Sequence, residues 1–208
     1  MIAIIDYGVG NLFSLQSSLS HIGIDAVVTN DADTIKNADK IILPGVGAFG
    51  DAIKKLRSSR LADLVCDEAK KGKPILGICL GMQLLFEKSF EYGEYEGLGL
   101  IEGEIRPIAD DVAEDVKIPH MGWNSLSFGK EKNEIFKYLN EGDFVYFVHS
   151  FYGTKCSGST IATTQYGTCL TAAVANGNVY GCQFHPEKSG ETGLSILKAF
   201  CEIGENDK

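Results

Sequence analysis

The sequence predicts an α/β fold in one domain, residues 1–208, built on a mixed, mostly parallel β-sheet flanked by helices. Three observations support this prediction. Apolar runs of strand length alternate with amphipathic stretches through the first half of the chain, a pattern typical of βαβ units. The second half carries short alternating segments, which favour antiparallel pairing. A chain of 208 residues also fits a single core, because cores tend to divide beyond roughly 250 to 300 residues.

The expected elements follow in chain order. In the first half, apolar runs predict strands at 2–6, 26–29, 40–43 and 74–78. Helical spacing of apolar residues predicts helices at 12–21, 51–71 and 80–88, the second of these as one or two helices. After turns rich in glycine and glutamate, strands are expected at 144–148, 159–164, 170–175 and 179–184. A helix at 193–203 covers the sheet, and residues 204–208 are expected to form a solvated tail.

Charge and hydropathy exclude several classes of partner. The formal net charge is −9 and the basic residues are not clustered, which argues against nucleic acid because phosphate binding needs clustered positive charge. The apolar run at the N-terminus is short and has no cationic lead. We therefore expect neither a signal peptide nor a membrane span, and place the protein in the cytoplasm.

The six cysteines include no Cys-x-x-Cys pair and are spread through expected strands and helices. This distribution is unlike a zinc site or a secreted disulfide framework, so at least four of them are expected to be small buried hydrophobic side chains. With four histidines and no His-Glu-x-x-His motif, the sequence predicts no metal site and no cofactor.

One cysteine, Cys79, stands in the motif Gly-Ile-Cys-Leu-Gly at 77–81, between an expected strand and an expected helix. Glycines at both flanks suit a sharp strand-to-helix turn, where neighbouring Cβ atoms would collide. The N-terminus of a helix favours a thiolate, and the Leu80 N–H is a natural oxyanion donor. A core cysteine at a strand end is the alternative, but the two spaced glycines favour a nucleophile.

A second glycine-rich turn, Pro-Gly-Val-Gly at 44–47, follows the expected strand at 40–43. Ligands of open α/β sheets bind at the carboxyl ends of strands, so this turn is a candidate source of a second oxyanion donor. Gly45, Gly47 and Gly50 also match a dinucleotide-binding fingerprint. That fingerprint belongs on the first strand-to-helix turn, with an acidic residue about 20 positions on, at the end of the next strand. Here the next strand ends at Cys79, and this context disfavours NAD or FAD.

The third motif, Phe-His-Pro-Glu-Lys-Ser at 184–189, ends an apolar strand with His185 and Glu187. Extended residues two positions apart face the same way, and Pro186 favours this backbone. The pair suits a histidine that acts as a general base and a carboxylate that orients it. By contrast, His120 and His149 lie among aromatic and small residues, which indicates roles in lining the site or facing a partner.

Three further segments complete a family resemblance: Asp-Tyr-Gly-Val-Gly-Asn at 6–11, Pro-His-Met-Gly-Trp-Asn at 119–124 and Phe-Val-His-Ser at 147–150. With the three motifs above, the whole chain resembles the class I, triad-type glutamine amidotransferases. Among them it is similar to the glutaminase subunits of imidazole glycerol phosphate synthases, from histidine biosynthesis. The resemblance implies the three-layer, flavodoxin-like fold of that class.

The resemblance also implies roles for individual residues. Cys79 is expected to attack the carboxamide of glutamine, His185 to protonate the departing ammonia, and Glu187 to orient His185. The residues expected around glutamine are Gly45, Val46, Gly47, Leu80, Gln83, Ser150 and Phe151. Among these, the Gly45–Val46 peptide and the Leu80 N–H would stabilise the oxyanion.

A partner chain is implied as well. The motifs extend to Ser189 and leave room for one more helix, so the acceptor of the ammonia is expected to bind another chain. By resemblance this chain is a cyclase with a (β/α)8 barrel, in a heterodimer that channels ammonia. The expected interface residues are Asn11, His120, Trp123, Tyr146 and Lys188. Partner binding is expected to switch activity by reorienting the peptide in the turn at 44–47.

Two departures from the family pattern keep alternatives open. Phe151 stands where the pattern leads us to expect tyrosine, and residues 154–160 are atypical of a histidine-pathway member. The alternatives are a paralogous subunit that supplies ammonia for surface-glycan biosynthesis, a stand-alone γ-glutamyl hydrolase and a catalytically silent subunit. The presence of all three triad residues argues against the last of these.

Overall fold

The computed structural model describes residues 1–129 and 131–204, so the predicted tail lies outside the described residues from position 205 onward. The helices are α1 (Leu12–His21), α2 (Ala32–Asn37), α3 (Phe49–Ser58), α4 (Leu61–Lys70), α5 (Leu80–Leu84) and α6 (Gly190–Cys201). Within this part of the chain, no helix has the length and apolar character needed to cross a membrane.

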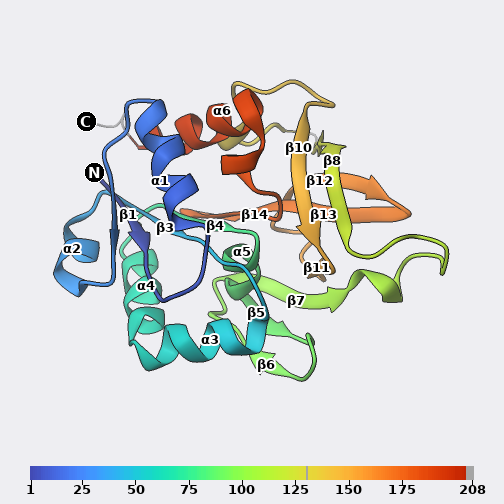
Figure 1. Cartoon of the computed structure of the whole chain (residues 1–208), viewed down its shortest axis with the longest axis horizontal. Coiled ribbons are helices and arrows are strands. Elements are labelled where there is room, and N and C mark those ends of the chain that lie inside the picture. The colour runs from blue at the N-terminus through green and yellow to red at the C-terminus, as the bar shows by residue number, and fades with distance from the viewer. Residues whose placement is uncertain (130, 205–208) are drawn as a thin grey trace.

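The central sheet combines parallel and antiparallel strands (Figure 1). Its strands, in spatial order, are β2 (Ala26–Thr29), β1 (Ile2–Ile5), β3 (Lys40–Leu43), β4 (Ile75–Ile78), β14 (Val179–Cys182), β13 (Thr168–Asn176), β12 (Thr160–Tyr166) and β9 (Ser127–Phe128). The pairings from β2 to β14 are parallel, and those from β14 to β9 are antiparallel. The predicted α/β class, with a mixed, mostly parallel sheet flanked by helices, is confirmed.

Two apolar layers cover the two faces of this sheet. Successive residues of β1 point to opposite faces, so Ala3 and Ile5 pack in one layer and Ile2 and Ile4 in the other. The first layer includes residues of α2, α3, α4 and α5, and the second includes residues of α1 and α6. Figure 1 shows α1 and α6 on one side of the sheet, and α3 and α4 on the other.

Two smaller sheets lie beside the central one. The first has the order β11 (Phe151–Thr154), β7 (Ile101–Pro107), β5 (Phe86–Ser89) and β6 (Tyr95–Glu96). The second is an antiparallel pair of β8 (His120–Ser125) and β10 (Phe144–His149). The antiparallel prediction for the second half is right for β10, β12 and β13, but β14 is also parallel to β4 and so completes the parallel half of the sheet.

The helix predicted at 80–88 is wrong in its second half. Helix α5 ends at Leu84, and the next residues form strand β5 instead. The chain at 97–99 folds back over this point, where Leu98 N–H donates to the Leu84 carbonyl at 2.8 Å and Gly99 N–H to the Phe86 carbonyl at 3.1 Å. These long-range bonds and the pairing of β5 with β6 and β7 override the local helical pattern.

Most of the cysteines occupy the buried positions expected for them. Cys79, Cys156, Cys182 and Cys201 are buried and Cys66 is half-buried, and no disulfide joins any two cysteines of the described residues. Cys169 is exposed on β13, which the sequence pattern did not distinguish.

Glycine allows α5 to begin directly against β3 and β4. A Cβ at Gly81 would overlap the carbonyl oxygen of Leu43, at the end of β3. A Cβ at Gly77 would lie 2.7 Å from the backbone of Met82. The collision expected from the spacing of these glycines is therefore confirmed, and it explains why the strand can turn into the helix within one residue, Cys79.

The variant Gly81→Ala is expected to destabilise the fold by at least about 1–3 kcal/mol, because the new methyl group meets rigid backbone. Gly158→Ala is the matched control, since a Cβ there has no neighbour within 4 Å, and its effect should stay within about 0.5 kcal/mol. Urea unfolding monitored by circular dichroism measures both. Equal stabilities for the two variants would contradict this account of the elbow.

Candidate active site

The candidate site lies where the carboxyl ends of the parallel strands meet. Cys79 follows β4, the turn at 44–47 follows β3, and His185 comes three residues after the end of β14. Because β3, β4 and β14 are neighbouring parallel strands, these three segments arrive at the same edge of the sheet. The topology therefore places together motifs that are more than 30 residues apart in the sequence.

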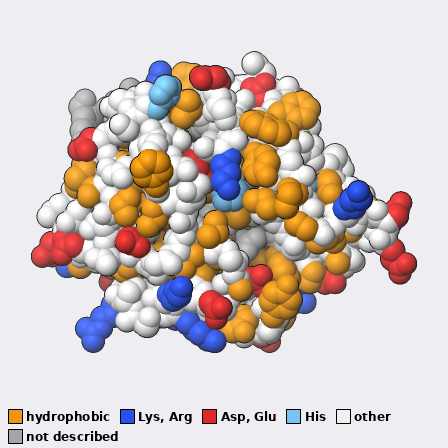
Figure 2. Space-filling view, in the orientation of Figure 1, with side chains coloured by type: hydrophobic (Ala, Val, Ile, Leu, Met, Phe, Trp, Pro, Cys, Tyr) orange, Lys and Arg blue, Asp and Glu red, His pale blue; other side chains and the backbone are white. Residues whose placement is uncertain are grey.

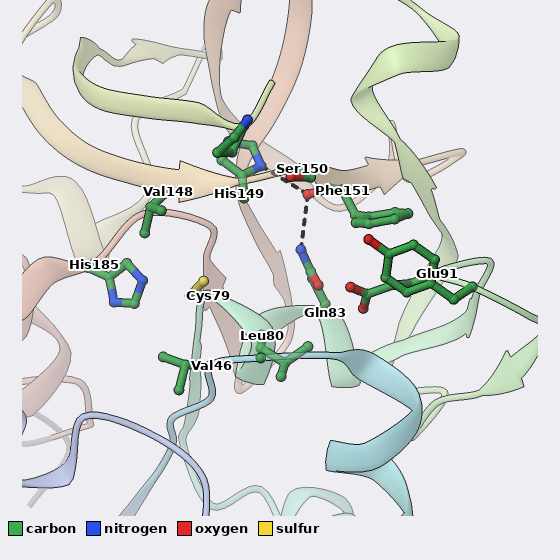
Figure 3. Close-up of a pocket in the computed structure, with 13 residues that line it drawn as sticks. Val46, Cys79, Leu80, Gln83, Glu91, Val148, His149, Ser150, Phe151 and His185 are labelled. Atoms are coloured by element: carbon green, nitrogen blue, oxygen red, sulfur yellow. Dashed lines mark hydrogen bonds between the residues drawn. The ribbon is translucent and has the colours of Figure 1, made fainter. Parts of the chain in front are cut away.

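Cys79 has a strained backbone. Its φ of 53° and ψ of −113° lie outside the regions that a non-glycine residue ordinarily adopts. Its N–H donates to the Cys182 carbonyl at 2.8 Å, which ties the turn to β14. Figure 3 shows the sulfur raised toward the pocket, with the His185 ring beside it.

His185 is buried and held by its neighbours on both sides. Its Nδ1 lies 2.8 Å from Glu187 Oε1, across the short 3₁₀ helix η3 (Pro186–Lys188). Burial lowers the pKa of His185, but hydrogen bonding and charge attraction from Cys79 and Glu187 outweigh burial and raise it to about 9. At neutral pH the imidazole therefore carries a proton and forms an ion pair with Glu187.

Strand β10 and Ser189 fix the backbone of this segment. His185 N–H donates to the Tyr146 carbonyl at 3.0 Å, and Tyr146 N–H donates to Ser189 Oγ at 2.9 Å. The Ser189 hydroxyl in turn donates to the His185 carbonyl at 2.7 Å. The orientation of His185 thus depends on β10 as well as on the end of β14.

The turn at 44–47 contacts the start of α5. Tyr7 is buried and donates its hydroxyl to the Pro44 carbonyl at 2.8 Å, while burial raises the pKa of this hydroxyl and the nearby Cys79 raises it further. A Cβ at Gly45 would lie 2.8 Å from both the Gly81 nitrogen and the Tyr7 hydroxyl. Gly47 has a φ of 93°, which glycine adopts readily.

A cavity of about 330 Å³ opens in front of Cys79. The residues that line it and were expected at the site are Val46, Gly47, Cys79, Leu80, Gln83, Ser150, Phe151 and His185. Gly45 lies behind this wall and lines a smaller cavity with Asn11, His185 and Glu187. His149 also lines the main cavity, which agrees with its expected role at the site.

Two further polar residues belong to the site and were not found from the sequence. Glu91 lines the cavity, and Figure 3 shows its carboxylate directed toward Gln83. Phe49 N–H donates to Glu91 Oε2 at 2.6 Å, and burial raises the pKa of this carboxyl. Nothing in the glutamate-rich stretch distinguishes Glu91 from its neighbours.

The second such residue, Gln183, is fully buried and its Nε2 lies 3.9 Å from Cys79 Sγ. Its carbonyl oxygen accepts a hydrogen bond from Gln83 Nε2 at 3.0 Å. Gln183 is two residues before His185, so the alternation of an extended chain could have indicated that both face the site.

Most of the predicted partner residues lie on or near one surface. Trp123 on β8 is 55% exposed and packs edge-on against Tyr146. Lys188 is exposed and directly precedes Ser189, whose hydroxyl oxygen accepts from the Tyr146 N–H. The surface also includes Met121 and Phe144, and Figure 2 shows hydrophobic side chains gathered over β8 and β10. Asn11 is half-buried at the small cavity next to Glu187.

His120 departs from the prediction that it contacts a partner. Its ring is only 2% exposed and is stacked between Phe147 and Tyr166. The reason is strand alternation, since Met121 and Trp123 face outward on β8 and His120 faces inward.

Comparisons with known proteins give the family. Residues 3–203 match the model of the class-I glutamine amidotransferases, and the chain therefore belongs to that class of glutamine-hydrolysing enzymes. Two bacterial relatives are both called imidazole glycerol phosphate synthase subunit HisH. That of Oceanobacillus iheyensis is 50% identical over 204 residues, which are 98% of this chain and 99% of the relative. That of Caldanaerobacter subterraneus subsp. tengcongensis is 51% identical over 205 residues, 98% of each chain. Within its class, the chain belongs to the family of these HisH subunits.

Solved structures agree on the fold. A glutamine amidotransferase is 18% identical with a TM-score of 0.74, covering 97% of this chain and 100% of its own. The PurLQS structure from Thermotoga maritima includes a chain that is 21% identical with a TM-score of 0.73, covering 97% of both chains. The predicted fold of the class I glutamine amidotransferases is thus confirmed.

His185 should titrate with a pKa of about 9 in NMR spectra of the folded chain. Glu187→Gln removes one of the two attractive partners and should lower this pKa, and Cys79→Ala should do the same. The ordinary pKa of a histidine is about 6.5. The stability that His185 gains from its two partners is therefore fully present below about pH 6.5 and is lost as the pH rises through about 9. His120 and His149 are internal controls, because burial lowers their pKa values to about 4 and about 3. A His185 pKa near 6.5 in all variants would contradict the proposed charge pair.

Proposed function

We propose that this chain is the glutaminase subunit of an imidazole glycerol phosphate synthase, acting in the cytoplasm on glutamine. It hydrolyses glutamine to glutamate and ammonia, and passes the ammonia to a cyclase subunit with a (β/α)8 barrel in histidine biosynthesis. The observation that carries this proposal is the placement of His185 between Cys79 and Glu187 at the mouth of the cavity. Relatives about 50% identical over nearly the whole chain support the histidine pathway over the surface-glycan alternative.

The charge pair defines the chemical steps. The Cys79 thiolate attacks the γ-carbonyl carbon of glutamine, and the carbonyl oxygen becomes an oxyanion. Collapse of this intermediate breaks the carbon–nitrogen bond, and the His185 imidazolium gives its proton to the leaving nitrogen, which departs as ammonia. The neutral His185 then takes a proton from water, which attacks the γ-glutamyl thioester and releases glutamate and the thiolate. Glu187 holds Nδ1 of His185 throughout, at 2.8 Å.

The oxyanion needs hydrogen-bond donors next to the sulfur. The Leu80 N–H, directly after Cys79, is one of them, and the Gly45–Val46 peptide beside it is the other. Tyr7 and the close approach of Gly45 to Gly81 hold the start of this turn, whereas Val46 is 42% exposed at its tip. The tip is therefore the part of the turn that a partner can reach and reorient.

The other end of glutamine is recognised by polar groups deeper in the cavity. Gln83 donates to the Phe151 carbonyl and to Gln183 Oε1, so its own side-chain oxygen is the atom left to accept from a ligand. The Glu91 carboxylate suits the α-ammonium group of the amino acid. Phe151 contributes its backbone carbonyl and its ring to this wall, where the family pattern led us to expect tyrosine.

The partner is proposed to cover the surface formed by Trp123, Met121, Tyr146, Phe144 and Lys188. Exposed aromatic and methionine side chains, with a lysine at their edge, are typical of protein interfaces. This surface adjoins the segment 185–189 through the hydrogen bonds of Tyr146. A cyclase bound there would close the site from the side on which ammonia is released.

Cys79→Ala in the assembled enzyme should abolish glutamine-dependent activity, with a loss of at least about 10³-fold, because the nucleophile is gone. Activity with free ammonia should persist, since the acceptor chemistry belongs to the partner. Cys169→Ala is the matched control, as Cys169 is exposed and does not line the cavity in front of Cys79, and this variant should retain activity with glutamine. Retention of glutaminase activity in Cys79→Ala would reject the assignment of the nucleophile.

The free chain should hydrolyse glutamine more slowly than the complex. One missing oxyanion donor costs about 2.7–4 kcal/mol, or about 10²–10³ in kcat, and this range is the expected difference. Steady-state release of glutamate, measured with and without the cyclase subunit, gives the comparison. Equal rates would favour the stand-alone hydrolase, as would high activity of the isolated chain on γ-glutamyl peptides.

A further inference from the structure

Two buried histidines lie directly opposite each other on the small sheet. His120 on β8 and His149 on β10 are paired residues in the antiparallel register, and His120 Nδ1 lies 2.9 Å from His149 Nε2. Both residues are buried, and the aromatic rings of Phe147 and Tyr166 enclose His120. The mechanism described above uses neither histidine for proton transfer.

The hydrogen bonds around these rings fix the position of every proton. Ser125 N–H donates to Asn124 Oδ1 at 2.8 Å, which identifies the oxygen of that amide. Asn124 Nδ2 therefore donates both its hydrogens, one to the Gln165 carbonyl at 2.9 Å and one to His120 Nε2 at 3.2 Å. His120 Nε2 is thus an acceptor, and the proton of the neutral ring must be on Nδ1.

The proton of His149, which lines the cavity, can be placed in the same way. His120 Nδ1–H donates to His149 Nε2, so His149 carries its proton on Nδ1. That N–H points to the Phe151 carbonyl oxygen, at 2.9 Å, and a carbonyl can only accept. Both ends of this series of hydrogen bonds, the amide of Asn124 and the carbonyl of Phe151, therefore require the same direction of donation.

Burial keeps both rings neutral, as this direction demands. It lowers the pKa of His120 to about 4 and is also the main cause that lowers the pKa of His149 to about 3. The hydrogen bond to Phe151 opposes the shift of His149, while the charges of His120 and His185 add to it. A second proton on either ring would place two N–H groups opposite each other.

The Phe151 carbonyl connects these rings to the nucleophile. It accepts a second hydrogen bond from Gln83 Nε2 at 3.0 Å, and Figure 3 shows both bonds meeting at this oxygen. Gln83 also donates to Gln183, whose Nε2 lies 3.9 Å from Cys79 Sγ. A continuous series of polar contacts thus extends from Asn124 on β8 to the sulfur.

We propose that Asn124, His120 and His149 are positioning residues of the glutaminase reaction, forming a hydrogen-bond relay of fixed direction. The relay sets the place of the Phe151 carbonyl and Gln83 in the wall of the glutamine pocket. It also ties this wall to the inner face of β8, the strand whose outer face exposes Met121 and Trp123. The kinetic part of this inference rests on the proposed function, and the tautomers do not.

NMR of the chain with ¹⁵N-labelled histidine tests the direction of the relay. At neutral pH, His120 and His149 should both appear as neutral Nδ1–H tautomers. Asn124→Asp replaces the donor with an acceptor of the same shape, so His120 should gain a proton on Nε2 in that variant. Nε2–H tautomers in the wild type, or an unchanged His120 in Asn124→Asp, would overturn the relay and leave the proposed function intact.

Kinetics of the assembled enzyme test what the relay does. Asn124→Asp should raise KM for glutamine about tenfold with little change in kcat, because the pocket wall binds substrate and transition state alike. Thr164→Val is the matched control: it removes the bond from Thr164 Oγ1 to the Ser125 carbonyl, between β12 and the same part of the chain, without touching the relay. KM in this control should stay within about twofold of the wild type.

A double-mutant cycle separates the relay from a loss of general structure. In His149→Asn, the amide nitrogen can still donate to the Phe151 carbonyl, whereas the contact with His120 is lost. Adding Asn124→Asp to this variant should then raise KM by less than about twofold, because the path is already cut. If the effects of Asn124→Asp and His149→Asn on KM were fully additive, or if Thr164→Val raised KM as much as Asn124→Asp does, the positioning role would be overturned. A wild-type complex without glutaminase activity would instead reject the proposed function.

Discussion

The approach of α5 to the ends of β3 and β4 is the constraint on which the site depends. Gly81 must lie against the Leu43 carbonyl, and Gly77 against Met82, for the chain to turn within one residue. This turn leaves Cys79 with a φ of 53°, and the surrounding backbone holds that strain through the bond to the Cys182 carbonyl. Cys79, the proposed nucleophile, is therefore directed to the cavity by packing that involves three neighbouring parallel strands. Any loosening of that packing acts directly on the position of the sulfur.

The histidines of this small region illustrate how the environment decides the role of one side-chain type. All three are buried, and burial alone lowers the pKa of an imidazole. His185 has Cys79 and a carboxylate as neighbours, so its pKa rises to about 9 and it can serve as the acid of the reaction. His120 and His149 have an amide, each other and a carbonyl as partners, so they stay neutral and each ring donates once and accepts once. In the proposed mechanism, one group of three rings thus supplies both the proton and a support for the wall of the glutamine pocket.

The sequence predicted those parts of the fold and the site that local patterns determine. The strands before Cys79 and His185, the glycine collisions and the shared direction of His185 and Glu187 all follow from short motifs. Strand β5 could not be predicted in this way, since bonds from residues about twelve positions away decide it. Alternation along each segment could have indicated the inward direction of His120 and Gln183, but the residues that these side chains meet depend on register and sheet order. The catalytic roles of the triad residues stay predictions until they are measured.

The register of β8 and β10 also explains how the proposed glutamine pocket and the proposed partner surface can share one pair of strands. In an antiparallel pair, the outward residues of each strand meet one another, as Trp123 and Tyr146 do, and the inward residues meet one another, as His120 and His149 do. The Tyr146 backbone holds both ends of the segment that carries His185 and Glu187, and His149 contacts the Phe151 carbonyl in the wall of the pocket. A displacement of these strands would therefore move the acid and the substrate wall together. A ligand that binds the outer face more tightly in one position of the two strands than in another would shift the site toward that position. A ligand that binds both positions equally would not.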